Sequence, residues 1–229
     1  MSFKTVPQMF QHVVSEKPTL KTFYTKTENG WEGVELADLQ VMVEDFANGL
    51  KNLGINDNDK VAIIGANSRK WSISDYAIAH IRAVSVPVYP TLIPAQSQYV
   101  VEHSESKIAI VQDEIQLDKV YPLINDANSN LHTIVIMDDS YDGGKDNVVK
   151  YADVFNMKDT QHDIKAISAT VEENDLLTLI YTSGTTGNPK GVMLSHSNIC
   201  NNLLSIDSTI KAAMELNPEL KPADGIERL

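Results

Sequence analysis

The sequence predicts an α/β protein with three layers, in which a largely parallel sheet is flanked by helices on both faces. Short apolar runs, several ending in glycine, proline or aspartate, are separated by segments of helical length. Parallel neighbours need such crossover segments, and a strand that is apolar throughout is typical of a sheet covered on both sides. The alternation and the apolar runs together favour this fold class.

The longest predicted helix rests on the spacing of its apolar residues. Leu36, Leu39, Val43, Phe46 and Leu50 recur at steps of three and four, and Gly54 follows as a stop signal. Strands are expected at residues 60–65, 85–90, 107–113, 132–138, 175–181 and 191–195. Further helices are expected at 71–84, 96–103, 115–124 and 198–216, and a turn-rich loop at 142–147.

Composition excludes several classes of protein. A net charge of −12 is the opposite of the broad basic face of a nucleic-acid binder, so no nucleic-acid partner is expected. Cys200 is the single cysteine, which excludes an intrachain disulfide and favours a reducing cytoplasm, and the scattered histidines predict no metal site. No apolar run approaches the roughly 20 residues of a membrane span. Peripheral membrane association and oligomeric state stay open.

The stretch YTSGTTGNPKGVMLSH, residues 181–196, has the chemistry of a phosphate-binding loop. Gly184 and Gly187 permit positive φ and let a ligand approach the backbone amides, which can form an anion-binding nest. Lys190 adds a positive charge on a flexible stem. Hydroxyl donors are supplied by Thr182, Ser183, Thr185 and Thr186. Each of these features suits a polyphosphate.

The spacing differs from that of a Walker A loop, which has four residues between its first glycine and a Gly-Lys pair and then leads into a helix. Here two residues separate Gly184 from Gly187, and an apolar, strand-like run follows. From composition alone, a hairpin connection without a ligand explains the stretch equally well.

Other candidate residues have plainer explanations. Asn67 stands where a dinucleotide-binding fingerprint needs its second glycine, which argues against such a site. His196 is a candidate base, but a structural or capping role fits its place between a strand and a helix at least as well. His80 and His103, in helical stretches, and Tyr181 are expected to be packing or surface residues.

The whole string changes the balance between these alternatives. YTSGTTGNPKG resembles, position for position, the phosphate loop of the adenylate-forming superfamily, and VMLSHSN resembles its usual continuation. WEGVELADLQ at 31–40 is similar to an early motif of that family. Residues 53–91, with Asn67, Trp71, Asp75 and the VPVYPT string, resemble the long-chain fatty acid–CoA ligase branch. Arg82 departs from the pattern, since relatives usually carry glycine there, and this puts the local helix packing in question.

The resemblance implies an ATP-dependent, AMP-forming ligase that joins a fatty acid to coenzyme A with Mg²⁺ as the ion on the phosphates. It assigns phosphate binding to Thr182, Ser183, Gly184, Thr185, Thr186, Gly187 and Lys190. No catalytic residue is expected in this chain, because the catalytic lysine of the family belongs to a C-terminal domain. Residues 1–229 are accordingly expected to be part of an N-terminal AMP-binding domain and inactive alone. The alternative is a stand-alone truncated homologue that binds a nucleotide or a partner without catalysis.

Overall fold

The structure, a computed structural model, describes residues 3–28, 30–157, 160–182 and 188–217. Its centre is a seven-stranded sheet in the order β7-β6-β5-β3-β4-β8-β9. The strands are β3 (Lys60–Ile64), β4 (Val84–Val88), β5 (Ser106–Val111), β6 (Thr133–Ile136), β7 (Val148–Lys150), β8 (Leu176–Thr182) and β9 (Lys190–Ser195). Neighbouring strands are parallel except β8 and β9, which form an antiparallel hairpin. The predicted, largely parallel sheet is confirmed.

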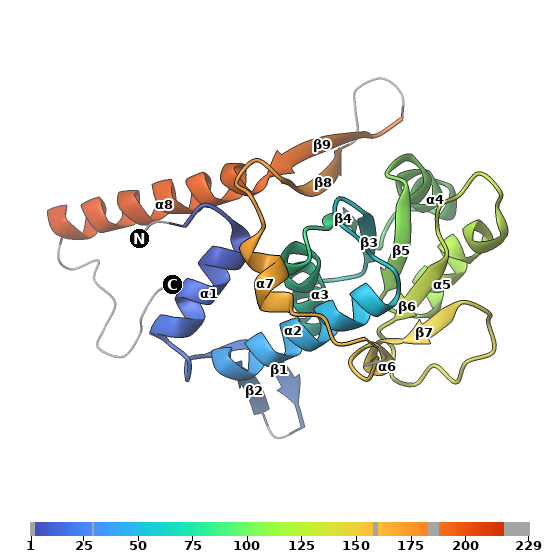
Figure 1. Ribbon diagram of the computed structural model, residues 1–229, viewed down its shortest axis with the longest axis horizontal. Coiled ribbons are helices and arrows are strands. Elements are labelled where there is room, and N and C mark those ends of the chain that lie inside the picture. The colour runs from blue at the N-terminus through green and yellow to red at the C-terminus, as the bar shows by residue number, and fades with distance from the viewer. Residues whose placement is uncertain (1–2, 29, 158–159, 183–187, 218–229) are drawn as a thin grey trace.

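Helices cover both faces of this sheet (Figure 1). One face carries α1 (Val6–Glu16), α2 (Leu36–Asn52), α3 (Arg69–His80), α6 (Tyr151–Val154) and α7 (Ile164–Ala169), and the other carries α4 (Pro94–His103) and α5 (Glu114–Val120). The alternation along β3 shows why. Val61 and Ile63 are buried on the side of α2, whereas Ala62 and Ile64 are buried on the side of α4 and α5. Both faces of β3 are buried, which is why the strand is apolar throughout. The three-layer prediction is confirmed.

Helix α2 forms where the apolar spacing predicts it. Leu39, Val43, Phe46 and Leu50 are fully buried against the sheet and the helices beside it. Gly54 then adopts a φ of +92°, a left-handed conformation that turns the chain away from the helix.

The predicted helix 71–84 is wrong at its C-terminal end. Helix α3 stops at His80, and Arg82 takes a left-handed φ of +56°. The amide of Ala83 then donates to the carbonyl of Ile78 at 3.1 Å, which closes the helix end and starts β4 at Val84. The apolar spacing of the sequence continues past His80, but the backbone leaves the right-handed helical conformation at Arg82.

The predicted helix 115–124 is also only partly correct. Helix α5 ends at Val120 and a 3-10 helix, η1 (Tyr121–Asn125), takes its place. Pro122 has no amide hydrogen to continue the α-helical pattern, which accounts for the change.

Several peripheral elements were not predicted. They are α1, the two-stranded hairpin of β1 (Lys21–Thr27) and β2 (Gly30–Glu35), the short β7, α6 and α7. The β1 and β2 side chains are exposed or half-buried, so no apolar alternation marks them. At the other end of the chain, α8 (His196–Leu216) projects from the body beside α1 (Figure 1). Among the described residues, none of the helices is long and apolar enough to span a bilayer.

Candidate phosphate-binding hairpin

The predicted phosphate loop connects β8 to β9. The two strands are paired up to their ends, with Thr182 opposite Lys190 and Tyr181 opposite Gly191. Both Thr182 and Lys190 are exposed, side by side at the mouth of the connection. The other predicted site residues lie outside the described residues: Ser183, Gly184, Thr185, Thr186 and Gly187. A strand follows the loop, as the contrast with a Walker A loop predicts.

The hairpin lies beside β4 but shares few backbone pairs with it. Between β4 and β8 one register pair is recorded, Ser85 with Thr178, whereas β8 and β9 are paired from Leu176 to Thr182. Beyond Thr178, β8 continues beside β4, but the register pairs recorded there join it to β9 (Figure 1). With few backbone pairs on the β4 side, side-chain contacts contribute to fixing the far end of the hairpin.

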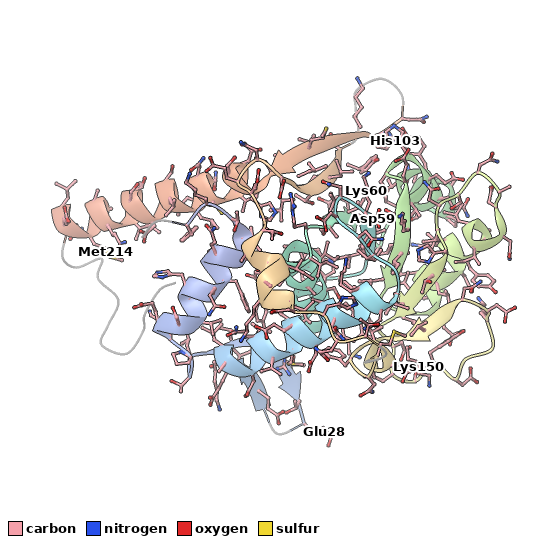
Figure 2. The ribbon with its side chains drawn as sticks, in the orientation of Figure 1. Glu28, Asp59, Lys60, His103, Lys150 and Met214 are labelled. Atoms are coloured by element: carbon pink, nitrogen blue, oxygen red, sulfur yellow. The ribbon has the colours of Figure 1, made fainter. Side chains whose placement is uncertain are left out.

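Helix α4 supplies those contacts. The Tyr181 hydroxyl and His103 Nδ1 lie 2.8 Å apart, and the Tyr99 hydroxyl donates to the Pro189 carbonyl at 3.2 Å. The His103 ring meets Tyr181 edge-on at 5.7 Å between centroids and lies 5.2 Å from the ring of Tyr99. Figure 2 shows His103 at the end of α4 that faces the hairpin. The expectation that Tyr181 packs is correct, but its partner was missed.

Two further observations concern the protonation of Tyr181 and the space around its ring. Burial, reinforced by the neighbouring Tyr99, raises the pKa of its hydroxyl, so Tyr181 is a neutral phenol able to donate a hydrogen bond. A Cβ atom at Gly191 would lie 3.2 Å from the Tyr181 ring. Glycine at this position in the opposite strand therefore leaves room for the Tyr181 ring.

The other end of the hairpin is fixed by His196. This side chain is fully buried, and its Nδ1 accepts the Val6 amide at the start of α1 at 3.2 Å. Burial lowers the pKa of His196 to about 4, against a smaller opposing effect of Asp175, so the ring is neutral. Ser195 caps α8 in a capping box with Asn198. These contacts support the structural role over that of a base.

The unusual Arg82 also contacts this region. Its guanidinium lies 3.0 Å from the carboxylate of Asp175, the residue before β8, and 3.3 Å from that of Asp57. Arg82 therefore ties the turn after α3 to the start of the hairpin strand. The helix packing that this arginine put in question is intact, and Arg82 itself adopts the positive φ of the turn.

The described residues offer no protein cage for a metal. No group of three or more histidine, cysteine, aspartate or glutamate side chains among them could hold a metal ion. The exposed Thr182 and Lys190 fit a phosphate group as donors.

Comparison with known proteins identifies relatives of this chain. The rat protein "Long-chain-fatty-acid--CoA ligase ACSBG1" is 29% identical over 197 residues, which cover 85% of this chain and 27% of the rat protein. The chain thus spans about a quarter of that relative's length.

Two crystal structures share the fold. The anthranilate CoA ligase AuaEII in complex with anthranoyl-AMP matches 85% of this chain and 35% of its own, with a TM-score of 0.71 and 20% identity. The N-terminal domain of FACL13 from Mycobacterium tuberculosis matches 85% and 45%, with a TM-score of 0.66 and 22% identity. A sequence profile described as "AMP-binding enzyme" matches residues 4–224. The chain belongs to the AMP-binding enzyme family.

Proposed function

We propose that this chain is the N-terminal portion of an ATP-dependent, AMP-forming long-chain fatty acid–CoA ligase. The observation that carries the proposal is the string 181–191, placed on a hairpin whose ends bring Thr182 and Lys190 side by side. The fatty-acid specificity is drawn from relatives named long-chain-fatty-acid CoA ligases, among them the rat protein. A single buried cysteine and the absence of a broad basic character fit a cytoplasmic enzyme without a nucleic-acid partner.

The proposed reaction has two steps. A carboxylate oxygen of the fatty acid attacks the α-phosphorus of ATP, and pyrophosphate leaves to give an acyl-adenylate. The thiol of coenzyme A then attacks the acyl carbon, and AMP leaves with the electron pair of the broken C–O bond. Magnesium carried by ATP would neutralise charge on the phosphates.

This chain's contribution is to hold the β- and γ-phosphates. The hydroxyls of Thr182, Ser183, Thr185 and Thr186 would donate to phosphate oxygens, and Gly184 and Gly187 would let backbone amides approach them. Lys190 would place a positive charge against the leaving pyrophosphate. Donors fixed before the reaction stabilise the charge that develops during phosphoryl transfer.

Isothermal titration calorimetry with Mg-ATP tests the phosphate role. Lys190→Ala should weaken binding about tenfold or more, because one charge-assisted interaction contributes about 1.5–3 kcal/mol. The matched control is Lys211→Ala, since Lys211 is an exposed lysine on α8 that pairs with Asp207. Equal affinities in the wild type and the Lys190 variant would overturn the phosphate role.

Ligation is expected to need more than this chain. The C-terminal catalytic lysine of the family has no proposed counterpart here, and Lys190 belongs to the phosphate loop. Incubation of the chain with ATP, a long-chain fatty acid and coenzyme A should give no acyl-CoA. Formation of acyl-CoA by the chain alone would show that the proposed division of labour is wrong.

A further inference from the structure

We propose that Tyr99 and His103 of α4 are positioning residues that hold the phosphate-loop hairpin at the end of β8 and at the residue that precedes β9. The proposal deepens the proposed function and rests on it: the loop can grip phosphates only while its two ends are fixed. Tyr99 and His103, together with their partners Tyr181 and Pro189, form a unit that we call the α4 clamp.

The need for a clamp comes from the sheet. Beyond the pair of Ser85 with Thr178, β8 has no recorded register partner on the β4 side. The stretch from Leu179 to Thr182 is paired only with β9, which is itself the last strand of the sheet. Although β8 lies beside β4, this end of the hairpin has few backbone pairs to the sheet, so side-chain contacts from another element can stabilise it.

The clamp reaches both sides of the loop from one turn of helix. Tyr99 and His103 are four residues apart, so their side chains lie on the same face of α4. His103 engages Tyr181 on the incoming strand, and Tyr99 engages the carbonyl of Pro189 on the outgoing side. Leu179 and Tyr181 also pack against the core beneath α4. One rigid turn thus fixes the spacing between the two ends of the loop.

The outgoing contact acts directly on Lys190. The carbonyl that Tyr99 holds belongs to the peptide unit that joins Pro189 to Lys190. Proline restricts φ on one side of this unit, and pairing with Thr182 fixes the strand on the other. The Tyr99 hydrogen bond further restricts the rotation of that peptide unit. It therefore also restricts the position of the Lys190 Cα atom, from which the side chain extends.

Hydroxyl-deletion variants separate positioning from folding. Tyr99→Phe and Tyr181→Phe each remove one hydrogen bond and leave the ring packing in place. The matched control is Tyr89→Phe, because Tyr89 is 66% exposed. His103→Ala and His103→Gln form a second pair, in which only glutamine can restore a hydrogen bond to Tyr181.

The first readout is hydrogen–deuterium exchange of the peptide covering residues 179–192 in the nucleotide-free chain. Each phenylalanine variant should speed exchange there about fivefold, the factor expected for one neutral hydrogen bond. Segments elsewhere that exchange by their own local opening should stay as in the wild type and in Tyr89→Phe, and the free energy of unfolding in urea should fall by about 1 kcal/mol at most. His103→Ala should behave like Tyr181→Phe, and His103→Gln should recover part of the protection. Unchanged exchange in both phenylalanine variants would overturn the clamp.

The second readout is the Mg-ATP affinity of the same variants. The α4 clamp predicts a loss of a few-fold or more in Tyr99→Phe and Tyr181→Phe with none in Tyr89→Phe. Faster exchange with unchanged affinity would overturn the positioning role. If the wild type itself bound no Mg-ATP, the proposed phosphate function would fail, and the exchange experiment would still decide whether α4 holds the hairpin.

Discussion

Arg82 offers a substitution whose backbone and side-chain effects have opposite signs. Its φ of +56° is a left-handed conformation that costs a residue with a Cβ atom about 1–2 kcal/mol and glycine almost nothing. Its guanidinium, however, donates from Nε to one oxygen of Asp175 at 3.1 Å and from Nη2 to the other at 3.2 Å. The two effects can be measured apart with two variants.

Arg82→Ala removes the ion pair and keeps the backbone strain. The side chains of Arg82 and Asp175 are 25% and 20% exposed, so the pair is partly desolvated but still screened by solvent. A loss of about 1–2 kcal/mol in the free energy of unfolding follows for this variant. Arg82→Gly loses the same pair but releases the strain, and should be more stable than Arg82→Ala by about 1 kcal/mol.

Urea unfolding at pH 7, followed by circular dichroism, measures both differences. Asp175→Asn, made in the wild type and in the Arg82→Ala background, completes a double-mutant cycle and should give a coupling energy of about 1 kcal/mol. If Arg82→Gly were no more stable than Arg82→Ala, the strain argument would be refuted. A coupling energy near zero would show that the Arg82–Asp175 contact contributes nothing.

Three further predictions concern stability. Gly49→Ala should lower the free energy of unfolding by about 3 kcal/mol or more in urea unfolding, because its Cβ would lie 2.2 Å from the Val154 carbonyl oxygen; a neutral result would mean that α6 moves freely. Asn48→Leu should cost about 1–3 kcal/mol by the same assay, because the buried Asn48 amide donates to the Met157 carbonyl at 3.0 Å and accepts the His162 amide at 2.9 Å; the matched exposed control is Asn201→Leu. Folding lowers the pKa of His196 from an ordinary 6.5 to about 4, so at pH values between these two the unfolded chain binds a proton that the folded chain does not. The free energy of unfolding should therefore fall by up to about 3 kcal/mol as the pH drops from 6.5 to 4. His196→Gln should flatten that slope relative to the wild type, and an unchanged slope would contradict the assignment.

The sequence predicts those parts of the fold in which a single local pattern, either helical spacing or a continuous apolar run, determines the element. The α2 positions from Leu36 to Leu50 follow a helical period, and β3 and β5 are apolar runs that can only be buried. Helix ends were harder to predict, because at Arg82 the chain takes a left-handed turn with a residue that rarely adopts it. The turn is held by Asp175 and Asp57, far away in sequence, and no local pattern contains that information.

The candidate site divides in the same way. The string 181–191 marks the loop because its chemistry is contiguous in sequence. The contacts from α4 are not: His103 and Tyr181 are separated by 78 positions in the sequence, and Tyr99 and Pro189 by 90. The spacing of Tyr99 and His103 was a local signal for a shared helix face. What that face meets depends on where β8 and β9 lie at the edge of the sheet, which is a tertiary property.

The central claim is that the hairpin loop grips the β- and γ-phosphates of ATP. Its most direct test is the affinity of the chain for Mg-ATP compared with AMP, in the wild type and in Lys190→Ala, by calorimetry at one ionic strength. The wild type should bind Mg-ATP at least about tenfold more tightly than AMP, and Lys190→Ala should remove most of that difference. Equal affinity of the wild-type chain for the two nucleotides would contradict the claim.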